Sequence, residues 1–233
     1  MTKNRIAATI FFIAAVSNLT SHILDIDWLT YISKPLLMVA LAYYLIQSVP
    51  SQFRGKVFYL SLIALFFSWL GDILLMLSGN GAVFFMLGIG AFLLAQVSYT
   101  IDFQFLKSNY TKGFHFLSII WALIVIIYSV NIWLDLRHNL GDFFVPVLAY
   151  LIVISLMAIS AGSRYRKTHT GSFLLCYAGA LVFMISDTLI AINKWHHAIE
   201  NERLIVMATY ILAQWMIING IIMHLKMHAA KEA

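Results

Sequence analysis

Two aspartates lie inside strongly apolar stretches of this chain, where carboxyl groups could carry out acid–base chemistry. Asp72 lies in "FFSWLGDILLML" (66–77) and Asp187 in "FMISDTLIAI" (183–192). A charged side chain at the centre of a membrane span costs about 2.5–3.5 kcal/mol on insertion scales, so such residues usually mark a functional site. Two acids that meet away from water can divide into one protonated acid and one ionised base. We therefore predict that both aspartates are catalytic. The plainer alternative is that each only hydrogen-bonds a neighbouring helix.

Further polar side chains are expected at the same outer level of the membrane, where they would bind substrate. This predicted binding set comprises Asn18, His22, Lys34, Ser68, Ser186, Tyr210 and Gln214. Lys34 would hold either a carboxylate or a lipid phosphate, with snorkelling to the interface as the alternative. For Tyr210 the alternative is the aromatic belt of a membrane protein, and for Asn18 and His22 it is a helix end.

The composition requires a membrane around these residues. Hydrophobic residues make up 62% of the 233 residues, charged residues only 11%, and the mean hydropathy is +0.88. Soluble domains carry about 25% charged residues, so this chain could not cover a water-exposed surface. We expect an all-α integral membrane protein that forms a single transmembrane domain over residues 1–233. Its net charge of +5 suits loops that face anionic lipid, and we do not infer nucleic-acid binding from it. The single cysteine, Cys176, excludes an internal disulfide.

Eight stretches are long and apolar enough to span a bilayer, which takes about 20 residues. The predicted spans are 5–24, 31–48, 57–77, 81–104, 114–134, 142–161, 172–192 and 203–225.

The Lys and Arg residues orient these spans, because cytoplasmic loops carry the excess of positive charge. The larger of the two loop sets holds Lys3, Arg5, Arg54, Lys56, Lys107, Lys112, Arg164, Arg166, Lys167, Lys226 and Lys231. The other set holds Lys34, Arg137, Lys194 and Arg203, which completes the 15 basic residues. Both termini are therefore expected in the cytoplasm, which agrees with an even number of spans.

Polar landmarks recur in the two halves of the chain. Asp72 and Asp187 lie 115 positions apart, Gln96 and Gln214 lie 118 apart, and Pro35 and Pro146 lie 111 apart. The simplest interpretation is a parallel 4+4 repeat with halves of about 1–110 and 111–233. Each aspartate then follows the start of an outward-running span by 15 residues. This register places both at one depth in the outer half of the membrane, where a pseudo-two-fold axis could bring them together.

An ordered set of motifs resembles a known family. The motifs are "SKPLLM" (33–38), "GDILLM" (71–76), "GIGAFLLAQVSY" (88–99), "YAGALVFMISDTLIA" (177–191) and "TYILAQW" (209–215). Together they look like the YhhN/TMEM86 family of lysoplasmalogenases. That family often has histidine where this chain has Gln96, which argues against proton transfer at that position. We interpret Gln96 as a packing or cavity group, and Asp102 on the same span as an interfacial residue.

The resemblance implies a hydrolase that cleaves the vinyl-ether bond of a lysoplasmalogen, giving a fatty aldehyde and a glycerophospho-headgroup, without a required cofactor. The expected partners are the lysophospholipid substrate and membrane lipid, and the expected location is a bacterial inner membrane. The competing hypotheses are a small proton-coupled transporter and a lipid-binding membrane protein. The sequence contains no H-E-x-x-H, G-x-S-x-G or P-loop pattern. His196 and Glu200 are spaced like metal ligands, but a solvated loop is the simpler interpretation.

Overall fold

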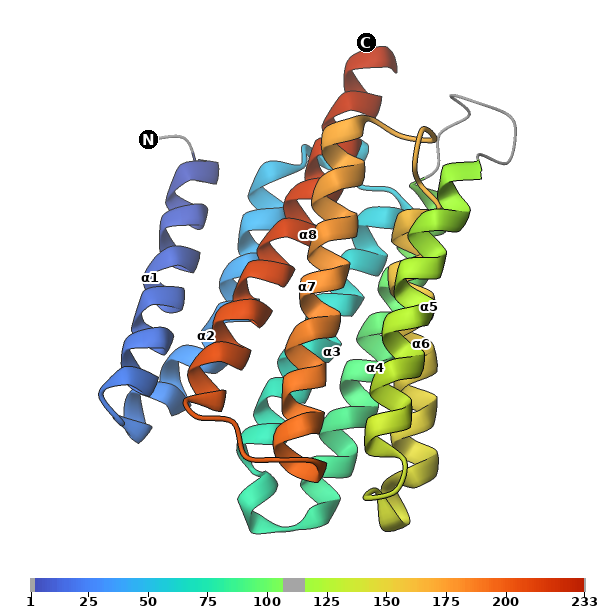
Figure 1. The fold of residues 1–233 in the computed structure, drawn as a ribbon. Helices are drawn as coiled ribbons and strands as arrows, with labels where there is room; N and C mark the ends of the chain where they lie inside the picture. Colours follow the sequence, from blue (N-terminus) through green and yellow to red (C-terminus); the bar gives the residue numbers. More distant parts are fainter. Residues whose placement is uncertain (1–2, 107–115, 233) are drawn as a thin grey trace. The chain divides into compact units, whose positions relative to one another are not determined.

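The computed structural model describes residues 3–106 and 116–232, and eight α-helices account for most of them (Figure 1). They are α1 (Lys3–Ile23), α2 (Asp27–Ser48), α3 (Lys56–Met76), α4 (Ala82–Phe105), α5 (Phe116–Leu136), α6 (Phe144–Gly162), α7 (Thr170–Trp195) and α8 (Glu202–Glu232). All eight are long and apolar enough to cross a membrane, and the described residues contain no β-strand. The prediction of an all-helical integral membrane protein is confirmed.

The helices begin and end close to the predicted spans. The largest differences are at α2, which starts at Asp27 rather than at 31, and at α8, which continues to Glu232 rather than ending at 225. The extension of α8 reads "KMHAAKE", a stretch of good helix formers without Gly or Pro to stop it. Lys107, Lys112 and the first two residues of the predicted fifth span, 114–115, lie outside the described residues.

The chain divides into two compact units, which we describe separately. The first unit comprises residues 1–102 and 225–233, and the second comprises residues 103–224. The first unit therefore contains α1, α2, α3 and most of α4, together with the end of α8. The second contains α5, α6, α7 and most of α8. The predicted repeat halves stay a prediction.

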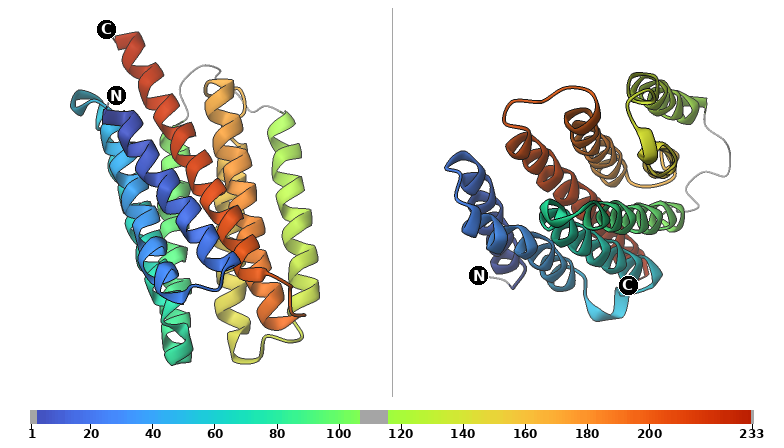
Figure 2. Two further views of the ribbon diagram at one scale, coloured as in Figure 1. Left: turned by 90° about the vertical axis from the view of Figure 1, so that its left-hand side faces the viewer. Right: turned by 90° about the horizontal axis from the view of Figure 1, so that it is seen from below.

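In the first unit, α1 and α2 form a tight antiparallel hairpin (Figure 2). Asp25 takes a left-handed conformation with φ of 51°, and the Ile26 amide donates to the Ser21 carbonyl at 2.9 Å. Short polar side chains such as Asp tolerate this conformation better than most residues. The hydroxyls of Ser21 and Thr30 lie 2.7 Å apart across the hairpin, which fixes how the two helices are aligned.

Glycines allow close helix contacts in both units. In the first unit, a Cβ on Gly71 would lie 2.6 Å from the Phe92 ring, so α3 approaches α4 there. In the second unit, a Cβ on Gly179 would lie 3.0 Å from the Ala213 carbonyl oxygen and 3.0 Å from the Ile217 amide nitrogen. Lipid tails are as apolar as leucine, so membrane helices associate through such close packing rather than through the hydrophobic effect.

In the second unit, α5 runs beside α6 (Figure 2). Many apolar side chains of α5 are exposed. Only Val125 and Leu136 of α5 are buried, whereas Ile127 and Val130 are 61% and 49% exposed. An apolar helix surface of this extent agrees with contact to lipid.

The Gly179 contact makes a stability prediction, because the backbone of α8 cannot move aside as a side chain can. Gly179→Ala should destabilise the protein by about 1–3 kcal/mol and lower its apparent Tm in detergent. Gly90→Ala is the control, because a Cβ at Gly90 meets open space and should stabilise helix α4 slightly. Equal Tm values for the two variants would contradict the close contact of α7 and α8.

Candidate functional site

An ion pair holds Asp72 in the first unit. Asp72 lies on α3 with 2% of its side chain exposed, and Lys34 reaches it from α2. The Lys34 Nζ lies 3.8 Å from the Asp72 Oδ1, and 15% of the lysine side chain is exposed. Of the roles predicted for Lys34, the contact with a carboxylate is the one seen. Ser68, one turn before Asp72 on α3, is fully buried.

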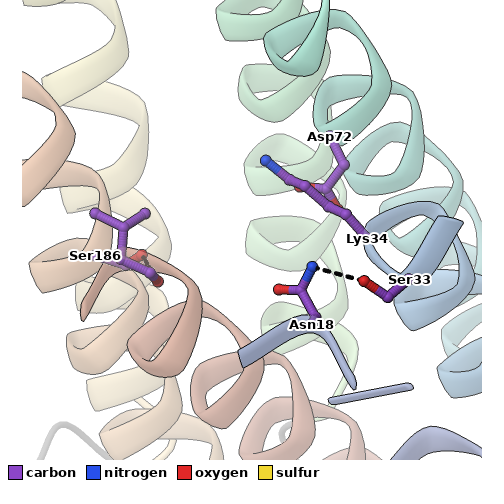
Figure 3. Close-up of polar contacts among 6 residues, drawn as sticks. Asn18, Ser33, Lys34, Asp72 and Ser186 are labelled. Carbon is purple, nitrogen blue, oxygen red and sulfur yellow. Dashed lines mark hydrogen bonds and ion pairs between the residues drawn. The ribbon is translucent and has the colours of Figure 1, made fainter. Parts of the chain in front are cut away.

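Asn18 joins this region through α1 (Figure 3). Its side chain is fully buried, and its Nδ2 donates to the Ser33 Oγ at 3.1 Å. Because Ser33 directly precedes Lys34 on α2, Asn18 lies at the level of the ion pair. His22, one turn beyond Asn18 on α1, is half-buried. The structure thus brings Asn18, Lys34 and Asp72 into one part of the first unit.

The second unit holds Asp187 in different surroundings. Asp187 is half-buried on α7, and the hydroxyl of Tyr150, on α6, donates to its Oδ2 at 2.5 Å. It stands eight residues before the end of α7 at Trp195, which is about 12 Å along the helix axis. The carboxyl group is therefore within the predicted membrane layer and is held by a neutral partner.

A pocket of mostly apolar character adjoins Asp187. It has about 380 Å³ of empty space, counting its open side. Tyr150 and Asp187 lie in its wall. The apolar part of the wall includes Trp133 and Leu136 from α5, Val147 and Ile154 from α6, and Met184 and Ala191 from α7. All of these residues belong to the second unit. An apolar recess with one carboxyl group suits an aliphatic ligand that carries a single reactive polar bond.

The remaining predicted residues of the second unit make structural contacts. The Ser186 Oγ donates to the Val206 carbonyl at 3.0 Å, which ties α7 to α8. The Tyr210 ring meets the Phe183 ring edge-on at 5.7 Å and is 3% exposed. Gln214 is fully buried. The substrate-binding roles of these three residues, and the pairing of Asp72 with Asp187, stay predictions.

Two charged residues are more deeply buried than their positions in the sequence indicated. Asp102 was expected at the membrane interface, but it is fully buried and its Oδ2 accepts a hydrogen bond from the Ser61 Oγ at 2.7 Å. Arg164 lies in the loop between α6 and α7, as expected, but it is fully buried, and its Nη2 donates to the Ser172 Oγ at 2.7 Å. Position along a span sets the depth of a residue, whereas burial depends on which face meets a neighbour.

Sequence reasoning missed Ser33 and Tyr150, the partners of Asn18 and Asp187. Asn18 and Ser33 stand seven and eight residues from Asp25 at the hairpin turn, so placing that turn would have aligned them. Tyr150 gives a weaker signal, because a tyrosine near the start of a span equally suits an aromatic belt.

Metal-ligand chemistry has no support in the part of the chain that the structure describes. No three His, Cys, Asp or Glu side chains there are grouped so as to hold an ion. His196 and His197 pack against each other with ring centroids 4.9 Å apart.

Comparisons with known proteins point in one direction. The model of the YhhN family matches residues 29–221. The bovine (Bos taurus) lysoplasmalogenase TMEM86A is 29% identical to this chain over 163 residues, which cover 66% of this chain and 62% of that protein. The match thus spans about three fifths of the length of this curated relative. No solved structure matches the chain significantly.

The ion pair makes a prediction about stability. Lys34→Met leaves the buried Asp72 carboxylate without its counter-charge, and breaking a buried pair in this way costs about 3–5 kcal/mol when both partners are fully buried. Because Lys34 is partly exposed, we expect a loss of up to about 3 kcal/mol, measured by thermal unfolding in detergent. The double variant Lys34→Met/Asp72→Asn removes both charges and should recover most of that loss. A double variant no more stable than Lys34→Met would contradict the pairing.

Proposed function

The chain belongs to the YhhN family, and we propose on that basis that it is a membrane-embedded hydrolase of lysoplasmalogens. It would cleave the vinyl-ether bond of a lysoplasmenyl ethanolamine or choline lipid, giving a fatty aldehyde and the glycerophospho-headgroup. The similarity to a lysoplasmalogenase supports the substrate class.

The observation that carries this proposal is how the two aspartates are held by neighbouring side chains. Both aspartates lie within the range that the family model matches. Asp72 and Asp187 each lie in a membrane-spanning helix, and a polar side chain from a neighbouring helix holds each of them. Vinyl-ether hydrolysis is accelerated by a general acid that protonates carbon and a general base that activates water, and a carboxylic acid with a carboxylate can fill these two roles. The chain supplies both groups.

The ion pair suggests which acid carries the proton. Lys34 balances the charge of Asp72, so we assign Asp72 as the carboxylate and Asp187 as the proton donor. Asp187 protonates the double-bond carbon that is not bonded to the ether oxygen, and an oxocarbenium ion forms. Asp72 stabilises that cation and takes a proton from the attacking water. In the collapse of the resulting hemiacetal, Asp187 takes the proton of the hemiacetal hydroxyl and Asp72 gives its proton to the departing glycerol oxygen. The aldehyde and the glycerol hydroxyl are released, and both acids return to their starting states.

The pocket beside Asp187 suits the hydrocarbon chain of the substrate. Its walls come from α5, α6 and α7 and are mainly apolar. Because the chain would arrive from lipid that is equally apolar, closeness of fit rather than the hydrophobic effect would hold it there. A chain seated in the pocket would present its vinyl carbons to the Asp187 carboxyl group. This arrangement would give the enzyme a preference for certain chain lengths.

We also propose the parallel repeat, cytoplasmic termini and a bacterial inner membrane as the setting. The excess of Lys and Arg in one set of loops supports the orientation. The eight spanning helices agree with an even number of crossings.

The second candidate is a proton-coupled carrier, and the burial of Asp102 favours it. The Ser61 hydroxyl hydrogen-bonds to Asp102 near the start of α3, whereas Asp72 lies near the end of that helix. A carrier needs polar groups along a whole path. Aldehyde release from a lysoplasmalogen, with the saturated-ether lipid as control, separates the hydrolase from this carrier and from a lipid-binding protein.

The mechanism predicts that neither aspartate can be replaced by its amide. Asp72→Asn and Asp187→Asn should each lower kcat/KM for a lysoplasmalogen by about 10²–10⁴, the usual contribution of a general acid or base. The measurement is aldehyde release by the purified protein, with thermal unfolding as the check on folding. Turnover near the wild-type rate in either folded variant would rule out this mechanism.

The pocket predicts a selective effect on chain length. Ala191→Leu should fill part of the pocket and lower kcat/KM about tenfold for a hexadecenyl lysolipid, with a smaller effect on an octenyl one. Ala178→Leu makes the same change on α7 outside the pocket lining and serves as the control. Equal effects on both lipids would mean that the chain binds elsewhere.

A further inference from the structure

The side-chain oxygen of Asn18 is a buried hydrogen-bond acceptor that lacks a donor among the described residues. Asn18 is 0% exposed, and its Oδ1 has no hydrogen-bond partner there. More than nine in ten buried polar groups in proteins are hydrogen-bonded, so an exception calls for a physical reason. The other end of the same amide is satisfied, because its Nδ2 donates to Ser33.

Ser33 fixes which way the amide faces. The Ser33 hydroxyl donates its only proton to the Leu29 carbonyl at 2.6 Å, so it offers only lone pairs to Asn18. The amide nitrogen must therefore face Ser33, because a flipped amide would set two acceptors against each other. Oδ1 is then the end that points away from Ser33.

The unsatisfied acceptor lies in the same part of the first unit as the Asp72 ion pair. Asn18 contacts Ser33, and the next residue, Lys34, reaches Asp72 at 3.8 Å. Figure 3 shows the Asn18 amide oxygen turned away from Ser33, on the same side of α2 as the extended Lys34 side chain. Asn18 lies before the range that the family model matches, which starts at residue 29. The unsatisfied Oδ1 is therefore a feature of this chain's own contacts and not of the family match.

The lysolipid offers one suitable donor near its reactive bond. Its phosphate and ether oxygens only accept hydrogen bonds. The ammonium of an ethanolamine headgroup also donates, but it stands beyond the phosphate, several bonds away from the vinyl ether. The free hydroxyl on the central glycerol carbon donates, carries no charge and stands next to the carbon that bears the vinyl ether.

We propose that the Asn18 Oδ1 accepts a hydrogen bond from this free glycerol hydroxyl and thereby selects the lyso form of the lipid. The inference rests on the proposed function. A lipid acylated at the central carbon has no proton to donate, and it leaves the buried oxygen unsatisfied. A site built to bond a hydroxyl rejects an analogue that lacks it far more strongly than a hydrophobic pocket rejects a change of size. For one neutral hydrogen bond we expect a preference of about ten- to a hundredfold.

The test measures binding, so that it does not depend on catalysis. Two uncleavable ligands are compared in detergent micelles: a saturated 1-O-alkyl lysophosphoethanolamine and its analogue without the central hydroxyl. The wild type should bind the hydroxyl ligand about ten- to a hundredfold more tightly. Asn18→Leu should bind the two ligands equally. Ser48→Ala, which removes a buried hydroxyl at the far end of the same helix pair, where it donates to the Asn4 Oδ1, should keep the wild-type preference.

The outcomes separate this inference from the proposed function. Loss of the preference in Asn18→Leu supports the inference, whereas retention of the preference overturns it, as does a wild type without any preference. If thermal unfolding shows that Asn18→Leu is not folded, Asn18→Ala gives the same comparison. A hydroxyl preference that depends on Asn18, in a protein that releases no aldehyde, would leave the recognition standing and overturn the hydrolase proposal. Aldehyde release with an unchanged preference in Asn18→Leu would overturn only the inference.

Discussion

A carboxyl group inside a membrane needs a partner from the protein itself, and this requirement governs how the helices of each unit meet. Lys34 reaches Asp72 from α2, and Tyr150 reaches Asp187 from α6. Ser61 and Asp102 repeat the pattern between α3 and α4. Water is scarce at this depth, so each of these contacts also fixes the rotation of one helix against another. The side chains best suited to acid–base chemistry therefore also set how neighbouring helices are rotated against each other.

The two aspartates differ in what holds them, and the proposed division of roles rests on that difference. Asp72 is almost fully buried against a cation, whereas Asp187 is half-buried beside a phenol and an apolar pocket. A carboxylate paired with an ammonium suits the stabilisation of a cationic intermediate. A carboxyl group with a neutral partner and direct access to a hydrocarbon pocket suits delivery of a proton to carbon. The assignment of roles follows from surroundings rather than from residue type.

The fold was more predictable than the contacts. Span length and hydropathy predicted eight helices because a bilayer imposes one length on every crossing. The partners of the site were harder, since Tyr150 and Ser33 meet Asp187 and Asn18 through the rotation of each helix. The apolar side chains of these helices show little preference for one face, so periodicity did not indicate that rotation. Asp102 shows the same point, because depth alone suggested an interfacial residue while packing buries it.

The pocket beside Asp187 lies among three membrane-spanning helices, and this setting changes what substrate concentration means. A lipid reaches such a recess by lateral diffusion within a two-dimensional film, not by collision from bulk water. Occupancy then depends on the mole fraction of substrate among the surrounding lipids or detergent. Adding detergent dilutes the substrate even when its molar concentration is constant. For the proposed hydrolase a KM is therefore properly a surface mole fraction, and values from different micelles would be comparable only on that scale.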